Sequence, residues 1–186
     1  MRSLGMDPVY DTRDCFRALV AAMSRPGTVS ESPTEPADHA VLSTLVDHEV
    51  TCFTPDETVW SALETEGRLS EADVAAASIV HAPDPSECPV RDLERGSLKE
   101  PSDGATVVYR VETLITDPDP TDDVTRLALS GPGVPGKRWL GVDGFSRDNA
   151  RALADAQSSY PCGVDAVLTT DRSIAAIPRS TELEVA

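Results

Sequence analysis

The chain has 186 residues, 40% of them hydrophobic, and its 32 acidic and 16 basic residues give a formal net charge of −16. This length is enough for one domain with a substantial core, which we assign to residues 1–186. The charge excludes nucleic-acid binding, which needs a basic surface, and it argues against binding to anionic membranes.

The first predicted element is a helix over residues 12–24, which Asp11 or Thr12 caps and Arg25-Pro26-Gly27 ends. Apolar residues recur in it at helical spacing, and we expect them on one buried face. These residues are Cys15, Phe16, Leu19, Val20 and Met23.

Between residues 30 and 104 the predicted elements are short. In chain order we expect a loop at 30–38, a helix at 40–47, a strand at 50–53, helices at 58–66 and 71–77, a strand at 77–80, a loop at 81–87 and a short helix at 90–95.

The clearest strand is predicted at 105–116, where apolar and polar residues alternate. After an acidic, proline-rich turn we expect strands at 124–129 and 139–142, a helix at 145–159 that Ser146 caps, and a hairpin of 164–169 with 173–177. Helices and strands alternate along the chain. This order predicts an α/β fold, a layered mixed sheet flanked by helices.

Glycine and proline are concentrated in four segments, at residues 23–28, 131–136, 160–165 and 178–181. Proline fixes φ and glycine allows φ > 0, so such segments hold one shape and bring backbone close to a ligand or a neighbouring chain. The loop at 131–136 lacks the spacing of a P-loop or of a dinucleotide site. A rigid turn at a sheet edge or interface is the plainer interpretation.

Two arginines, Arg25 and Arg179, each lie beside a proline in these segments. An arginine on a rigid loop can present a fixed fork to phosphate or carboxylate, but we favour pairing of each with one of the many acids. Asp165 follows Gly163 at the start of a predicted strand, where it faces a ligand crevice or caps a turn. The three histidines, His39, His48 and His81, are too scattered to indicate a site.

The four cysteines lie far apart, with no Cys-x-x-Cys pair and no histidine at ligand spacing, so we predict no metal site. We interpret Cys15, Cys52, Cys88 and Cys162 as small core residues with free thiols. No apolar run typical of a signal peptide or of a membrane span, which needs about 20 residues, is present. We therefore expect a cytoplasmic protein.

Acidic residues are spread along the whole chain, and only Lys99 and Lys137 are lysines. One interpretation is an acidic face that binds a cationic partner. The other is a halophilic surface, in which hydrated carboxylates replace lysines and keep the protein soluble in high salt. Because the acidic residues are not clustered in one part of the sequence, we favour the halophilic interpretation.

Several segments together resemble one family, PhnH, the H subunit of the bacterial and archaeal carbon–phosphorus lyase system. The resemblance covers about residues 7–185 and is weakest across 54–95. The segments that carry it are Phe16-Arg17-Ala18-Leu19 with 22–27, 42–47, 96–101 with 105–111, Leu129-Ser130-Gly131-Pro132-Gly133-Val134, Tyr160-Pro161-Cys162-Gly163-Val164-Asp165 and Pro178-Arg179-Ser180-Thr181.

This resemblance implies a fold like that of pyridoxal-phosphate-dependent transferases, without the cofactor. It implies a homodimer when the protein is alone, and assembly with the G, I and J subunits into the core complex that degrades phosphonates. That complex attaches ribose triphosphate to an alkylphosphonate, displacing adenine from ATP. Lys99 lies in a polar turn and Lys137 follows the loop at 131–136, so neither suits the buried Schiff base of a pyridoxal enzyme.

Two functions therefore remain. The first is a non-catalytic or site-assisting subunit of the carbon–phosphorus lyase core complex, with an exposed apolar patch for its partners and no activity alone. The second is a stand-alone nucleotide- or phosphate-binding enzyme, in which Arg25, Arg179 and the loop at 131–136 converge on a phosphate. The candidate ligand or interface residues are Arg25, Pro26, Gly27, Gly131, Pro132, Gly133, Gly163, Asp165, Arg179 and Thr181.

Overall fold

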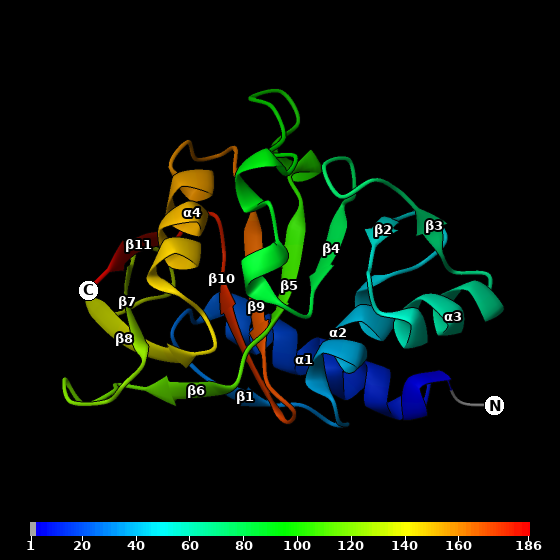
Figure 1. The fold of residues 1–186 in the computed structure, drawn as a ribbon, viewed down its shortest axis with the longest axis horizontal. Helices are drawn as coiled ribbons and strands as arrows, with labels where there is room; N and C mark the ends of the chain where they lie inside the picture. The colour runs from blue at the N-terminus through cyan, green and yellow to red at the C-terminus, as the bar shows by residue number, and fades with distance from the viewer. Residues whose placement is uncertain (1–2) are drawn as a thin grey trace.

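A mixed seven-stranded sheet runs through the middle of the computed structural model, which describes residues 3–186 (Figure 1). Five neighbouring strands, from β9 to β3, are parallel, whereas β10 and β1 are antiparallel to their neighbours. In spatial order its strands are β1 (Ser30–Glu31), β10 (Ser173–Ile177), β9 (Asp165–Thr169), β5 (Thr106–Arg110), β4 (Ile79–Ala82), β2 (Thr51–Phe53) and β3 (Ser70–Glu71). The expected mixed sheet and the expected hairpin of β9 and β10 are confirmed.

A second, four-stranded antiparallel sheet lies at one end of the molecule, opposite the end that holds α3 and β3 (Figure 1). A separate second sheet was not expected from the sequence. Its strands, in spatial order, are β11 (Glu182–Val185), β7 (Thr125–Ser130), β8 (Lys137–Asp143) and β6 (Thr113–Thr116).

The single strand expected at 105–116 is wrong, because the chain changes sheets in its middle. The Val111 amide donates to the Thr169 carbonyl in the large sheet, and the next amide, Glu112, donates to Asp143 in the small one. Apolar and polar side chains alternate directly across this point, in Tyr109-Arg110-Val111-Glu112. The alternation therefore predicts extended backbone without showing where the strand leaves its first partner.

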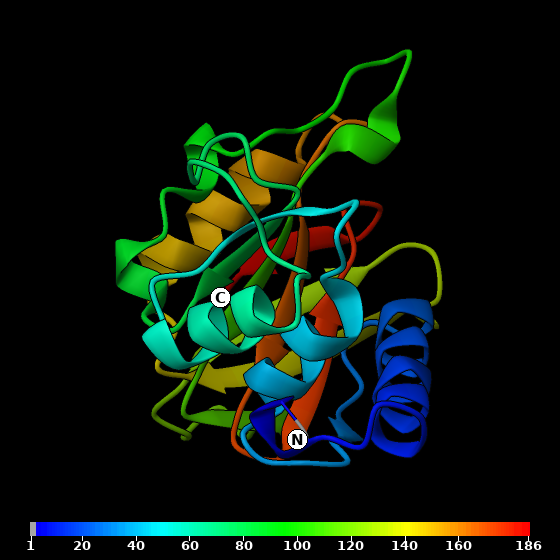
Figure 2. The same cartoon turned by 90° about the vertical axis from the view of Figure 1, so that its right-hand side faces the viewer.

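Helices cover both faces of the large sheet, and Figure 2 shows α1 and α4 on opposite sides of it. Buried residues of α1, α2 and α3 form one apolar cluster with β2, β9 and β10. Buried residues of α4 form a second cluster, which joins the large sheet to the small one. The helices are α1 (Tyr10–Ser24), α2 (Ala37–Leu45), α3 (Glu57–Thr65) and α4 (Arg147–Gln157), with short 3-10 helices η1 (Ser3–Gly5), η2 (Pro85–Glu87), η3 (Val90–Asp92) and η4 (Pro101–Asp103).

The expected buried face of α1 is wrong in part. Cys15, Leu19 and Ala22 face the core, but the side chains of Phe16 and Val20 are exposed, at 55% and 50%. These two residues lie one position further round the helix than Cys15 and Leu19, so about 100° separates the two pairs. The predicted cap is wrong too, because Asp7 Oδ1 accepts the Val9 and Tyr10 amides instead.

Several smaller expectations were also wrong. The helix expected at 71–77 is a turn after β3, β4 begins two residues later than predicted, and Val90–Asp92 is a single 3-10 turn. The loop expected at 30–38 contains β1 and the start of α2, and β11 was not anticipated. The helix at α4 and its cap are confirmed, because Ser146 Oγ accepts the Asn149 amide at 3.1 Å.

Cys15 and Cys52 are buried, as expected of small core residues, and Cys88 and Cys162 are partly buried. Burial raises the pKa of the Cys52 thiol to about 11, which keeps it protonated. Over residues 3–186 no helix is long and apolar enough to cross a membrane. Within the same residues no group of three or more His, Cys, Asp or Glu side chains is arranged to hold a metal ion.

Candidate functional site

Three of the four glycine-proline segments meet at one place, which we call the loop junction: residues 24–27, 131–134 and 180–182. A Cβ on Gly133 would overlap the Ser24 carbonyl at the end of α1, and one on Gly131 would lie 3.1 Å from the Ser180 carbonyl oxygen. Gly133 has φ +79°, a value that only glycine adopts at low cost. The glycines therefore allow three backbone segments to pack directly on one another.

The other predicted residues of this junction differ in exposure. Pro26 and Gly27 are buried, and a Cβ on Gly27 would lie 3.1 Å from Cβ of Arg138 on β8. Arg25 and Pro132 are exposed, whereas Thr181 is buried with its hydroxyl oxygen unpaired within the described residues. At the junction, the end of α1 therefore packs against both strands of the β7–β8 hairpin, and the loop of that hairpin packs against the start of β11.

Arg179 does not point into this junction but to the amino ends of β5 and β9. Its Nε and Nη2 donate to Asp165 Oδ2 at 3.0 and 2.5 Å, and its backbone amide donates to Asp165 Oδ1 at 2.7 Å. Nη1 donates to the Pro101 carbonyl at 2.5 Å, and Nη2 also donates to the Gly104 carbonyl at 3.0 Å. We call this arrangement the amino-end clamp.

The amino-end clamp is built into tightly packed backbone. A Cβ on Gly104 would overlap both the Arg179 guanidinium and the Gly163 carbonyl oxygen. The Arg179 and Asp165 side chains are only 14% and 16% exposed. The clamp therefore holds the base of the projecting loop at 96–104, and the guanidinium has few donors left for a ligand.

A second ionic cluster, the carboxyl-end network, lies at the opposite edge of the same sheet, around the buried side chains of Asp38 and His81. Asp38 in the first turn of α2 accepts from Arg110 Nη1 at 3.1 Å and lies 3.2 Å from His81 Nε2. His81 Nδ1 is 2.9 Å from the Thr54 hydroxyl, and Arg110 Nη2 donates to Asp171 at 2.5 Å. These residues follow or end β2, β4, β5 and β9, and carboxyl ends of parallel strands gather at one edge.

Electrostatics favour the ionised form of Asp38. Burial alone would raise the pKa of its carboxyl group, but the hydrogen bond with His81 and the charges of His81, Arg110 and His39 outweigh it. The pKa of Asp38 therefore lies below its ordinary value of 3.8. Desolvation also raises the pKa of the nearby Asp56 carboxyl, 3.4 Å from His39 Nε2, but the amides of Val59 and Thr58 and the contact with His39 together lower it below its ordinary value.

A cavity of about 490 Å³ opens where the start of α4 meets the acidic turn at 122–125. Its lining carries four carboxylates against one arginine, Arg147, so it repels phosphate groups. The lining carboxylates belong to Asp84, Asp122, Asp123 and Asp143. None of the residues predicted from the glycine-proline segments lines this cavity.

The comparisons with known proteins identify the family. A model of the family described as "Bacterial phosphonate metabolism protein (PhnH)" matches residues 5–184. This chain belongs to the PhnH family.

Two curated relatives match over most of both chains. The "Putative C-P lyase subunit protein HtxG" of Stutzerimonas stutzeri is 31% identical over 91% of this chain and 84% of its own length. The "Alpha-D-ribose 1-methylphosphonate 5-triphosphate synthase subunit PhnH" of Rhizobium meliloti (strain 1021) is 23% identical over 96% and 92%. The resemblance to PhnH stated from the sequence is therefore confirmed.

In this PhnH-family chain the sequence analysis missed the carboxyl-end network. Its members come from five separate segments between residues 38 and 171, none of which forms a motif. A signal was nevertheless present: Arg110 follows a nearly continuous apolar strand, and a charge directly at the end of such a strand faces the carboxyl-end edge.

A second feature of this PhnH-family chain lies on its surface. Among residues 3–186, six large hydrophobic residues are exposed, and four of them lie at the start of α1 or on it. These four are Val9, Tyr10, Phe16 and Val20, and the remaining two are Leu98 and Tyr160. An apolar surface of this kind is what the sequence analysis expected of a subunit that binds partners.

Proposed function

We propose that this chain is a non-catalytic or site-assisting subunit of the carbon–phosphorus lyase core complex in organic phosphonate catabolism. In this role it assembles with the G, I and J subunits and supports formation of ribose 1-alkylphosphonate 5-triphosphate from ATP and a phosphonate. On its own it is a homodimer without activity, located in the cytoplasm. The likeness to pyridoxal-phosphate-dependent transferases, without their cofactor, stays a prediction of the same resemblance.

One observation carries the proposal: two curated relatives that align over most of both chains are named as subunits, one of a C-P lyase and one of a ribose 1-methylphosphonate triphosphate synthase. Full-length likeness to such subunits favours a role of the same kind. The arrangement of the candidate residues agrees with it. Three of the four glycine-proline segments pack against one another, and apolar side chains remain exposed on α1.

The stand-alone phosphate-binding function has less support. It needs Arg25, Arg179 and the loop at 131–136 to face one phosphate, but the Arg179 guanidinium donates to Asp165 and to two backbone carbonyls. Arg25 and the loop lie at the loop junction instead. We therefore retain the subunit role as the function and do not propose a phosphate site.

Purification of the tagged chain from phosphate-starved source cells tests the proposal, with bound proteins identified by mass. Recovery of the G, I and J subunits in stoichiometric amounts is the expected result. A clean homodimer without these subunits would contradict the proposal, and nucleotide binding by the chain alone, measured with ATP by calorimetry, would then favour the stand-alone function.

A further inference from the structure

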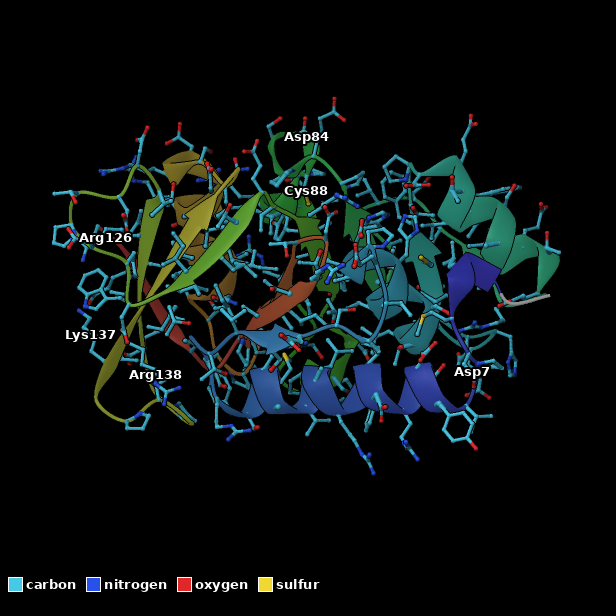
Figure 3. The ribbon with its side chains drawn as sticks, turned by 90° about the horizontal axis from the view of Figure 1, so that it is seen from below. Asp7, Asp84, Cys88, Arg126, Lys137 and Arg138 are labelled. Carbon is cyan, nitrogen blue, oxygen red and sulfur yellow. The ribbon has the colours of Figure 1, made fainter. Side chains whose placement is uncertain are left out.

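Helix α1 is apolar on two faces, and the fold uses only one of them. Cys15, Leu19 and Ala22 pack into the core against α2 and β10, which satisfies the face that anchors the helix. The second face, which we call the outer face of α1, carries Val9, Phe16 and Val20, exposed by 64%, 55% and 50%. Figure 3 shows α1 along the lower edge of the molecule, between Asp7 near its start and Arg138 beyond its end, with side chains pointing away from the body.

The spacing of the outer face is that of a helix-packing surface. Val9 and Phe16 are seven residues apart and Val20 follows four residues later, so all three lie in one row along the helix. The row is about 16 Å long, which is three turns at 1.5 Å per residue. A partner helix packs its own apolar ridge against a row of this length.

Basic residues lie beside this row. Arg13 and Arg17 flank the row on one side, and Arg25 is exposed just beyond the end of the helix. The chain as a whole carries 32 acidic residues against 16 basic ones. The one carboxylate that the two flanking guanidiniums share is that of Asp14, at 3.2 and 3.4 Å.

This charge pattern argues against a second copy of the chain as the occupant. A two-fold contact places the same patch on both sides of the interface. If two copies of α1 pack antiparallel about such an axis, the Arg13 and Arg17 flank of one lies beside the same flank of the other, and like charges repel. A partner with carboxylates beside its apolar ridge meets the arginines with complementary charge instead.

We propose that the outer face of α1 is the docking site for an amphipathic helix, flanked by acidic residues, of a partner subunit of the phosphonate-degrading complex. The inference rests on the proposed function and adds to it the surface and the chemistry of the contact. The apolar row supplies the buried area, and the arginine flank fixes the register and the choice of partner.

Co-expression of the tagged chain with the G, I and J subunits of the same organism tests this inference. The test variant is Phe16→Glu with Val20→Glu, which puts two carboxylates into the apolar row. The matched control is Leu98→Glu, because Leu98 is 82% exposed and lies in the loop at 96–104, away from α1. A second variant, Arg13→Glu with Arg17→Glu, inverts the flank and leaves the row intact. All the substituted side chains are exposed, so thermal melts close to that of the wild type serve as the check on folding.

The expected result is that the wild type and the Leu98→Glu control recover the partner subunits, whereas Phe16→Glu/Val20→Glu recovers them at least tenfold less well. The charge inversion should also reduce recovery, by a smaller factor. Equal recovery with Phe16→Glu/Val20→Glu and with the wild type would overturn the inference and leave the proposed function standing. No recovery even with the wild type would overturn both. Loss of the homodimer in the same variant, measured by light scattering of the chain alone, would identify a second copy as the occupant and overturn the inference as well.

Discussion

The two edges of the large sheet are each held by a buried ion pair, and the two pairs are built differently. At the amino ends of β5 and β9, the amino-end clamp joins Arg179 to Asp165 and to two backbone carbonyls. At the carboxyl ends, the network joins Asp38 to His81 and Arg110, which are side chains from separate strands. The clamp fixes a loop to the sheet, whereas the network fixes α2 to β4 and β5.

This difference explains why the sequence indicated residues of the amino-end clamp as candidates but none of the carboxyl-end network. The clamp needs glycines where backbone approaches the guanidinium, and glycine beside proline stands out in a sequence. The network needs only side chains that meet across the sheet, which leave no local pattern. The candidate residues Arg179 and Asp165 therefore have a structural role, which is to hold the loop at 96–104 against the sheet.

The largest expected effect is at the carboxyl-end network. Asp38→Ala removes a carboxylate that is 1% exposed and leaves Arg110 and His81 without their shared acceptor. We expect a loss of about 4 kcal/mol in the free energy of unfolding, as for other buried pairs that lose one partner. Urea unfolding at pH 7 measures it. A loss under about 1 kcal/mol would show that the network does not anchor α2.

At the amino-end clamp we expect a somewhat smaller effect. Arg179→Met keeps the length of the side chain but leaves Asp165 and two carbonyls unpaired, at a cost of about 3 kcal/mol. The control is Arg91→Met, since Arg91 and Asp155 form an ion pair whose side chains are 57% and 63% exposed. That exposed pair should contribute less than about 1 kcal/mol. Equal losses in the two variants would mean that the clamp is no stronger than a surface pair.

Acid should weaken the carboxyl-end network, because its stability depends on the ionised carboxylate of Asp38. The lowered pKa of Asp38 means that its stabilising contribution is fully present above pH 3.8 and is lost as the pH falls through the folded-state value. Asp38→Asn cannot titrate, so its stability should fall less steeply than that of the wild type below pH 3.8. Urea unfolding at a series of pH values from 7 downward gives both curves. Parallel curves would contradict the assigned ionisation.

Salt should have the smallest effect on stability. It should weaken the repulsion between surface carboxylates and leave the ion pairs at both edges of the large sheet unchanged. If the acidic surface is a halophilic adaptation, molar KCl screens its repulsion and stabilises the wild type by on the order of 1 kcal/mol, about 3 °C in Tm. The losses caused by Asp38→Ala and Arg179→Met should stay the same, because both ion pairs are shielded from solvent. A thermal melt that does not change between low and high KCl would contradict the halophilic interpretation.

The sequence predicted the elements with strong local signals and failed where the fold depends on distant contacts. Ser146 before an amphipathic helix gave the correct start of α4, and two short apolar runs on either side of Asp171-Arg172 gave the hairpin of β9 and β10. Residues 105–116 read as one strand because side-chain alternation does not record the exchange of hydrogen-bond partners after Val111. Burial of Phe16 and Val20 was wrong because a wide apolar stripe on a helix does not say whether another chain covers part of it.

The same distinction applies to the candidate site. The glycine-proline segments indicated places of close backbone approach, and three of them do meet at the loop junction. Their spacing could not tell that the Arg179 side chain turns away to Asp165, because that direction is set by the loop at 96–104. The carboxyl-end network forms no motif, since His81 and Asp38 are 43 residues apart, and the charge of Arg110 at the end of its strand is its one local signal.

Hydrogen–deuterium exchange of α1 tests the central claim most directly, with the chain measured alone and in the complex recovered with its G, I and J partners. The account predicts slower exchange over residues 9–24 in the complex and unchanged exchange at the carboxyl-end network. Unchanged exchange over 9–24, with slowing confined to the loop at 96–104, would contradict it and place the contact at Leu98 instead.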